Sequence, residues 1–184
     1  MAARGSDAGD AASRPVLRVL RTRGPLFVCE DPAGLLRRLP QTRKRHHRGA
    51  CLSIEELEHV ARAAEVVWLR PEDALRRAEL RERHASACRL YHHLTDVAGL
   101  RLRHGSQFGA AFVGYRDLRG HGACLVFLGP LARPAAVAAA RVAGSVAKEA
   151  WVAEELHGGG GGFTLTRLGE TRGEPRAKRC RGVP

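Results

Sequence analysis

A tyrosine, a histidine and a lysine, at positions 115, 121 and 148, are side chains of the types that exchange protons and stabilise negative charge. Tyr115 closes residues 105–115, whose apolar residues alternate with the period of a strand that is covered on both faces. A polar turn follows, and His121 opens a second apolar run that ends near residue 129. A hairpin with a short loop would therefore hold the Tyr115 and His121 rings near one another.

Lys148 lies in a second predicted element, a helix that begins at Pro134 and runs to about residue 150. Alanine and valine residues form one face of this helix, and Lys148 points nearly to the opposite side. Periodicity alone is equally consistent with a lysine that simply faces solvent. The helix therefore supplies a candidate cation, but the pattern by itself assigns it no role.

These residues together resemble the catalytic C-terminal domain of the tRNA-splicing (tRNA-intron) endonuclease family. That family has a glycine- and aromatic-rich run that ends in tyrosine, then a histidine before an apolar strand, then a lysine within an Arg-Val-Ala helix. The matching residues in this sequence are Gly105, Phe108, Gly109, Phe112, Tyr115, His121, Arg141, Val142, Ala143, Val146 and Lys148. The resemblance covers about residues 86–168, and it is closest to the eukaryotic catalytic subunit that cuts the 5′ splice site.

The resemblance implies a tRNA-intron lyase, a metal-independent endoribonuclease that needs no cofactor. Tyr115 would be the general base for the RNA 2′-hydroxyl, His121 the general acid, and Lys148 the cation that stabilises charge on phosphorus. The products would carry a 2′,3′-cyclic phosphate and a 5′-hydroxyl. Because tyrosine ordinarily titrates near 10, we expect the neighbouring Lys148 cation to lower the pKa of Tyr115.

Two departures from the family pattern keep other functions open. Ala111 stands where the family has an aspartate, and Tyr115 and His121 are only six positions apart, fewer than is usual. A non-catalytic structural subunit of the same complex is one alternative. A general basic RNA-binding protein is another, although aromatic residues for base stacking make up only 5% of the chain.

The composition agrees with a nucleic-acid partner. The 184 residues carry a formal net charge of +12, which attracts polyanions, although a codon bias toward arginine would contribute to the same excess. The five cysteines lack paired spacing, so we expect reduced thiols and no zinc site. Without a long apolar run or a secretory signal, we expect no membrane association. A basic stretch at 176–179 suggests import into the nucleus, with the cytoplasm or an organelle as alternatives.

The first half of the chain contains signals for a small mixed domain. Residues 16–20 and 26–30 predict a hairpin, and a short helix follows over 33–39. The basic stretch 40–49 is either a solvated loop or a phosphate contact. Ser53 predicts a helix N-cap with Glu56 at the capping-box position, in an element that extends to Trp68. Further helices are predicted from Pro71 and over 86–97.

We therefore expect an α/β (α+β) fold, in which a small mixed N-terminal domain precedes a restriction-endonuclease-like domain with a mixed sheet flanked by helices. The expected ranges are a disordered tail at 1–14, the domains at 15–84 and 85–168, and a basic tail at 169–184. Short strands are predicted at 100–103, 151–153 and 163–166, with a glycine turn at 158–162. The resemblance implies that pre-tRNA is the substrate and that the strand at 163–166 pairs with another subunit of a heterotetramer-like assembly.

Overall fold

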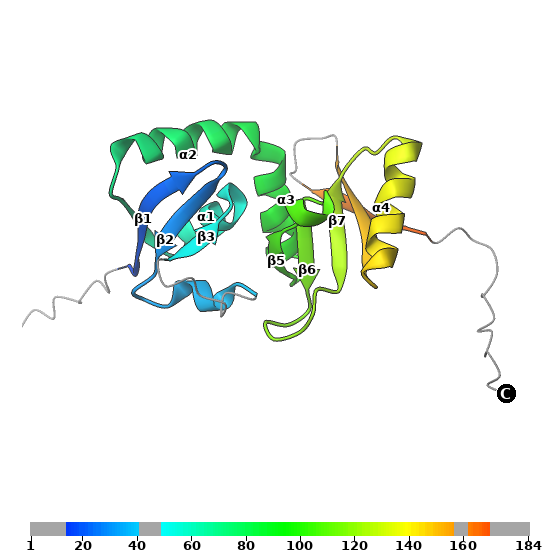
Figure 1. The fold of residues 1–184 in the computed structure, drawn as a ribbon, viewed down its shortest axis with the longest axis horizontal. Helices are drawn as coiled ribbons and strands as arrows, with labels where there is room; N and C mark the ends of the chain where they lie inside the picture. Colours follow the sequence, from blue (N-terminus) through cyan, green and yellow to red (C-terminus); the bar gives the residue numbers. More distant parts are fainter. Residues whose placement is uncertain (1–13, 41–48, 157–161, 170–184) are drawn as a thin grey trace, which may run out of the picture.

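The computed structural model describes residues 14–40, 49–156 and 162–169, which form two β-sheets with four α-helices (Figure 1). One sheet comes from the first half of the chain and one from the second, and α3 lies between them. The predicted fold class, a mixed α/β fold whose second sheet is flanked by helices, is confirmed. Among the described residues, no helix is both long and apolar enough to cross a membrane.

The first sheet has the strand order β3-β2-β1-β4. Strands β1 (Val16–Arg23) and β2 (Leu26–Glu30) form the predicted hairpin, and β3 (Ala50–Leu52) continues it in antiparallel fashion. Strand β4 (Glu65–Trp68) pairs in parallel with β1, so the prediction of one continuous helix to Trp68 is wrong. Val66 and Trp68 contact the core as alternate residues of a strand, the period-2 pattern of a strand rather than of a helix.

Two helices close this first core. The predicted capping box at α1 (Ile54–Ala61) is confirmed: the Ser53 hydroxyl accepts from the Glu56 amide, and the Glu56 carboxylate accepts from the Ser53 amide. Helix α2 (Pro71–Arg83) begins at the predicted proline, and its buried Asp73 accepts hydrogen bonds from the amide and hydroxyl of Thr22 on β1. The predicted helix at 33–39 is a shorter 3₁₀ turn, η1 (Leu35–Arg38), whose first amides bond to the Asp31 carboxylate.

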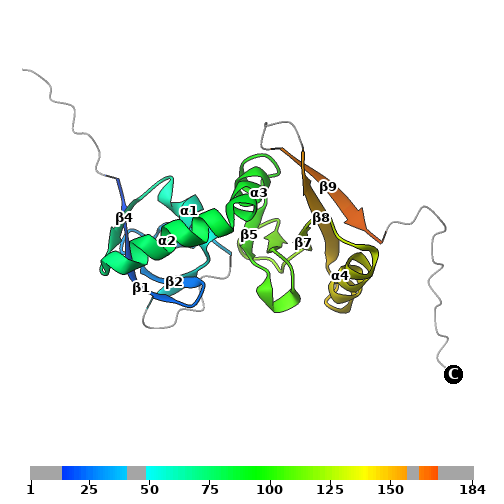
Figure 2. The same ribbon diagram turned by 90° about the horizontal axis from the view of Figure 1, so that it is seen from above.

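The second sheet has the sequential order β5-β6-β7-β8-β9. Its strands are β5 (Arg101–His104), β6 (Phe112–Tyr115), β7 (Cys124–Leu128), β8 (Glu149–Glu155) and β9 (Phe163–Leu168). All pairs are antiparallel except β7–β8, which α4 (Arg133–Ser145) connects as a parallel crossover. Helices α3 (Ala85–Asp96) and α4 cover opposite faces of this sheet, each over its own core (Figure 2).

Two predictions in the second half need correction. Residues 105–111 are not strand: the chain turns through the 3₁₀ segment η2 (Ser106–Phe108) to Gly109, which has a φ of 65°. The last helix ends at Ser145 rather than near residue 150, so Lys148 is not helical. Ala147 has a φ of 53°, and this left-handed residue turns the chain from α4 into β8. Alanine gives no sequence signal for such a stop, which glycine would have given.

The two halves meet through α1 and α3 and through a buried ion pair. The carboxylate of Glu56, which is fully buried, lies 2.8 Å from Nε of Arg103 on β5. Arg62, the residue after α1, pairs with Asp96 on α3, and the centroid of the His59 ring lies 5.2 Å from that of the Tyr91 ring. Tyr91 is 1% exposed and belongs to the core between α3 and the second sheet. Of these contacts, the Glu56–Arg103 pair is largely buried, whereas the Arg62–Asp96 pair is exposed. A domain boundary near residue 84 stays a prediction.

Several predicted segments fall wholly or mostly outside the described residues. They are the tail at 1–14, the basic stretch at 41–48, the glycine turn at 158–161, and the basic tail from 170 to the end.

The left-handed residue before β8 makes a prediction about stability. Ala147→Gly should raise the free energy of unfolding by about 0.5–1 kcal/mol, because glycine adopts a positive φ without the steric cost that alanine incurs. Denaturation of the full chain in urea measures this change. As a matched control, Gly144→Ala introduces the opposite change within α4, where an added Cβ meets nothing within 4 Å, and it should stabilise by a similar amount. A loss of stability in Ala147→Gly would contradict the assigned backbone conformation.

Candidate active site

Tyr115, His121 and Lys148 come together at one edge of the second sheet. In the sheet register, Gly114 of β6 pairs with Cys124 of β7, and Cys124 pairs with Glu149 of β8. Extended by one residue, this register places Tyr115, Ala123 and Lys148 side by side in a row across the three strands. Two hydrogen bonds hold them there: the Ala123 amide donates to the Gly114 carbonyl, and the Glu149 amide donates to the Ala123 carbonyl. His121 lies two residues before Ala123, in the loop above this row.

Lys148 is held by the loop that carries His121. Its Nζ donates a hydrogen bond of 2.9 Å to the carbonyl of Gly122, the residue next to His121. Gly122 is tightly packed: a Cβ added there would lie 2.5 Å from Cγ1 of Val113 and 3.3 Å from Cε of Lys148. A side chain at this position would clash with Val113 and press against the Lys148 side chain. Although the helical placement of Lys148 was wrong, the cation and the histidine loop are in direct contact.

Tyr115 is buried on the face of the sheet that α4 covers. It belongs to the same core as Val113 and Leu125 and is only 6% exposed. Burial raises the pKa of its phenol, the Arg103 guanidinium acts in the lowering direction, and the Glu56 carboxylate raises the pKa again. The expectation that Lys148 lowers this pKa is therefore wrong. The net pKa shift is upward, and the cation that acts on the phenol comes from β5.

His121 is exposed at the end of a structured turn. The Asp117 carboxylate accepts hydrogen bonds from the amides of Arg119 and Gly120, so it closes the loop just before the histidine. This Asx-type turn is what lets the chain return from β6 to β7 within so few residues. The short loop therefore has a defined course that ends with His121 next to the Lys148–Gly122 contact.

Two residues near Tyr115 were not predicted as part of the site. Arg103 follows a hydrophobic residue in a short strand, and Glu56 was recognised only as a helix cap. Their pairing joins residues that are far apart in the sequence, so no local pattern could reveal it. The one available signal was the charge itself, an arginine that alternates with core residues in a predicted strand.

The position of Ala111, where the family has an aspartate, is also defined. Its amide donates to the carbonyl of Val126 and its carbonyl accepts from the amide of Gly105, so the backbone ladder continues through it without a carboxylate.

Within the described ranges, no three histidine, cysteine or acidic side chains are grouped so that they could hold a metal ion. The candidate site thus offers proton donors, acceptors and a cation.

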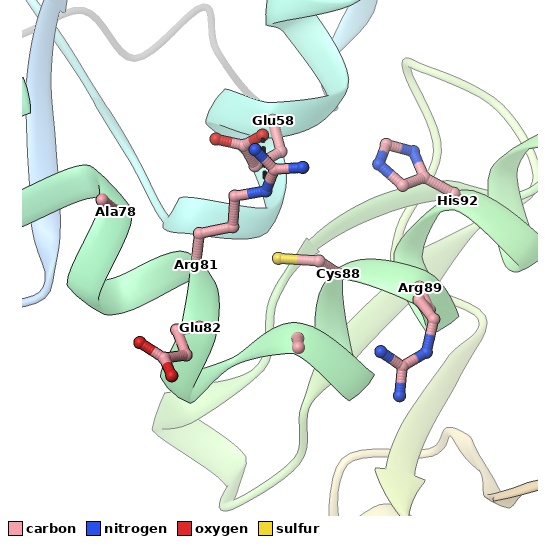
Figure 3. Close-up of a pocket in the computed structure, with 8 residues that line it drawn as sticks. Glu58, Ala78, Arg81, Glu82, Cys88, Arg89 and His92 are labelled. Carbon is pink, nitrogen blue, oxygen red and sulfur yellow. Dashed lines mark ion pairs between the residues drawn. The ribbon is translucent and has the colours of Figure 1, made fainter.

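A pocket of about 470 Å³ lies elsewhere, between α1, α2 and α3 (Figure 3). Its walls are formed by Glu58, Ala78, Arg81, Glu82, Ala85, Cys88, Arg89 and His92. Burial raises the pKa of the Cys88 thiol to about 12, so the thiolate nucleophile is scarce at neutral pH. None of the lining residues belongs to the candidate active site, and mixed charges around an inert thiol assign the pocket no chemistry.

The burial of Tyr115 can be tested by titration. The chain has only two tyrosines, so Tyr91→Phe leaves Tyr115 as the sole phenol. Its ultraviolet phenolate absorbance should appear at a higher pH in the native protein than in the same variant in denaturant, which should titrate near the ordinary value of about 10. Because the folded state favours the neutral phenol, this contribution to stability is present below pH ~10 and is lost as the pH rises through the folded pKa. A native midpoint at or below that of the denatured chain would contradict the assignment.

Comparison with known proteins gives the site its context. Residues 84–160 match the family model described as tRNA intron endonuclease, catalytic C-terminal domain. The match begins at the residue before α3 and includes Tyr115, His121 and Lys148. A search of curated proteins found no match to the chain. Residues 84–160, which include most of the mixed sheet and the two helices that flank it, are therefore similar to the tRNA intron endonuclease catalytic C-terminal domain family.

Proposed function

We propose that this chain is a catalytic subunit of a tRNA-splicing endonuclease and that it cleaves pre-tRNA at an intron splice site. The RNA 2′-hydroxyl oxygen attacks the adjacent phosphorus, and the bond from phosphorus to the 5′-oxygen breaks. The products carry a 2′,3′-cyclic phosphate and a 5′-hydroxyl. This chemistry transfers protons and spreads charge but needs no external nucleophile, which suits a site made of tyrosine, histidine and lysine.

The observation that carries this proposal is the contact between the two loops at the sheet edge. The Lys148 ammonium bonds to the backbone of Gly122, beside His121, and Tyr115 ends the neighbouring strand in the same row. A phosphate near Nζ of Lys148 would therefore lie at the sheet edge that also carries the His121 loop and the end of the Tyr115 strand. Three separated segments of sequence, none catalytic alone, supply these groups.

Each proposed role follows from the side chain and its surroundings. Tyr115 accepts the proton of the 2′-hydroxyl, His121 donates a proton to the departing 5′-oxygen, and Lys148 stabilises the non-bridging oxygens. Because burial raises the pKa of Tyr115, its phenolate is a small fraction at neutral pH. That phenolate is also a stronger base than an ordinary one, so a low population is partly offset by a higher intrinsic reactivity.

The assembly is proposed on the same basis. Strand β9 is an edge of the second sheet, paired only with β8 among the described strands, and its unpaired side could accept a strand from another subunit. We propose a heterotetramer-like complex in the nucleus that cuts the 5′ splice site, as the resemblance to the eukaryotic catalytic subunit suggests. Activity should therefore be measured on the assembly that is purified through a tag on the full chain.

The division of roles can be tested with a modified substrate. His121→Ala and Lys148→Ala should each slow cleavage of an intron-containing pre-tRNA by roughly 10² or more, the size expected when an acid or a charge stabiliser is lost. A pre-tRNA with sulfur in place of the bridging 5′-oxygen separates the two roles, because a thiolate leaves without needing a proton. On that substrate His121→Ala should recover most of its lost rate.

Lys148→Ala and Tyr115→Phe serve as the matched comparisons. Both should stay slow on the sulfur substrate, because charge still builds on the non-bridging oxygens and the 2′-hydroxyl must still lose its proton. Rescue of Lys148→Ala but not of His121→Ala would reverse the two assignments. If neither variant is rescued while RNA binding is intact, His121 is not the acid. Absence of cleavage by the unmodified assembly would favour a non-catalytic subunit.

A further inference from the structure

Arg103 shares the Tyr115 face of the second sheet although it belongs to the edge strand β5. In the antiparallel register, Arg103 pairs with Val113, and Arg101 pairs with Tyr115. Val113 and Tyr115 lie two residues apart on β6 and face the same core. Side chains of directly paired residues share a face, so Arg103 is a diagonal neighbour of Tyr115, a relation that separates Cα atoms by about 7–8 Å.

The guanidinium of Arg103 is held from the first half of the chain. Its Nε lies 2.8 Å from Oε1 of Glu56 at the start of α1, and its Nη1 donates to the carbonyl of Pro40 at 3.1 Å. Glu56 itself is fixed, because its other oxygen caps α1 through the Ser53 amide. Arginine has five N–H donors, and within the described residues only these two contacts of Arg103 are observed. The cation is anchored at one end and retains donors for another group.

Other charges stand around the same end of the sheet. They are Arg101 on β5, then Arg116, Asp117, Arg119 and His121 in the loop, Lys148 before β8, and the Glu56–Arg103 pair. Lys148 is engaged with the Gly122 carbonyl. Two of these charges act on the pKa of Tyr115: the Arg103 guanidinium lowers it, and the Glu56 carboxylate raises it. The electrostatic environment of the phenol is thus set by the ion pair between the two halves of the chain.

We propose that Arg103, anchored by Glu56, is a positioning residue that stabilises the Tyr115 phenolate and so makes the first sheet domain part of the catalytic apparatus. This inference rests on the proposed role of Tyr115 as the base. Before Tyr115 can accept the 2′-hydroxyl proton and become a neutral phenol, it must be a phenolate, and a nearby cation favours that negatively charged state. Arg103 therefore supplies the role that the sequence had suggested for Lys148, and Lys148 is left to the phosphate.

The direct test is a phenol titration of the full chain in the Tyr91→Phe background, with Tyr115 as the only reporter. Arg103→Gln should move the Tyr115 midpoint to higher pH, because the lowering charge is gone. Glu56→Gln should move it to lower pH, and glutamine can still cap α1. Shifts of opposite sign cannot come from general loosening of the interface, which would move both variants in one direction. Shifts of the same sign, or no shift in either variant, would overturn the proposal.

Two further variants guard against a folding defect. Arg103→Lys keeps the charge and should hold the midpoint close to that of the parent. The double variant Glu56→Gln/Arg103→Gln leaves no unpaired buried charge, and its midpoint should lie between that of Arg103→Gln and that of the parent, because the arginine is the larger of the two charge effects. If the single variant Arg103→Gln does not fold, a double-variant midpoint that equals or falls below that of the parent overturns the proposal.

Cleavage by the tagged assembly separates this inference from the proposed function. Arg103→Gln should slow cleavage at neutral pH on the order of tenfold, the size expected for a charge about 8 Å away at an effective dielectric constant of 20–30. Arg103→Lys should recover most of that loss. If the parent cleaves and Tyr115→Phe is inactive while Arg103→Gln is fully active, the inference fails and the proposed function stands. If the parent assembly does not cleave, the proposed function fails first.

Discussion

The buried carboxylate of Glu56 is the constraint from which the arrangement of the two halves follows. A charge with no exposure to water must be paired and hydrogen-bonded, and Glu56 meets this demand from both sides of the interface. One oxygen accepts from the Ser53 amide of its own helix, and the other accepts from Arg103 and from the His104 amide on β5. Removal of either partner would leave a buried charge uncompensated, a loss of about 3–5 kcal/mol.

The register of the second sheet carries that constraint to the candidate site. With β5 fixed at Arg103 and His104, its pairing with β6 determines where Tyr115 ends the strand. The pairing of β6 with β7 and of β7 with β8 then sets the row that contains Lys148. Ala147 in a left-handed conformation and Gly122 without a side chain complete the approach of Lys148 to the histidine loop. A charge pair between the halves and two unusual backbone positions thus shape one sheet edge.

The sequence predicted the elements better than their ends. The hairpin of β1 and β2, the capping box at Ser53, the proline that starts α2, and α3 were all found because each has a local signal. Strand β4 was missed because its period-2 pattern covers only four residues and its partner β1 is far away in the sequence. The end of α4 was misplaced because an alanine at positive φ gives no local signal. Tyr115, His121 and Lys148 could be named from the motif. The pKa of Tyr115 could not be predicted, because burial raises it and Arg103 opposes that rise, and only the tertiary structure reveals both.

The central claim is that groups at this edge activate the RNA's own 2′-hydroxyl. The most direct measurement uses a pre-tRNA with a single 2′-deoxyribose at the nucleotide whose 2′-hydroxyl would attack, incubated with the assembly purified through the full chain. We predict unchanged RNA binding and no cleavage at that position, because the nucleophile has been removed. Cleavage at the normal rate, with a product that ends in a simple phosphate, would show that another nucleophile attacks and would contradict the roles assigned to Tyr115, His121 and Lys148.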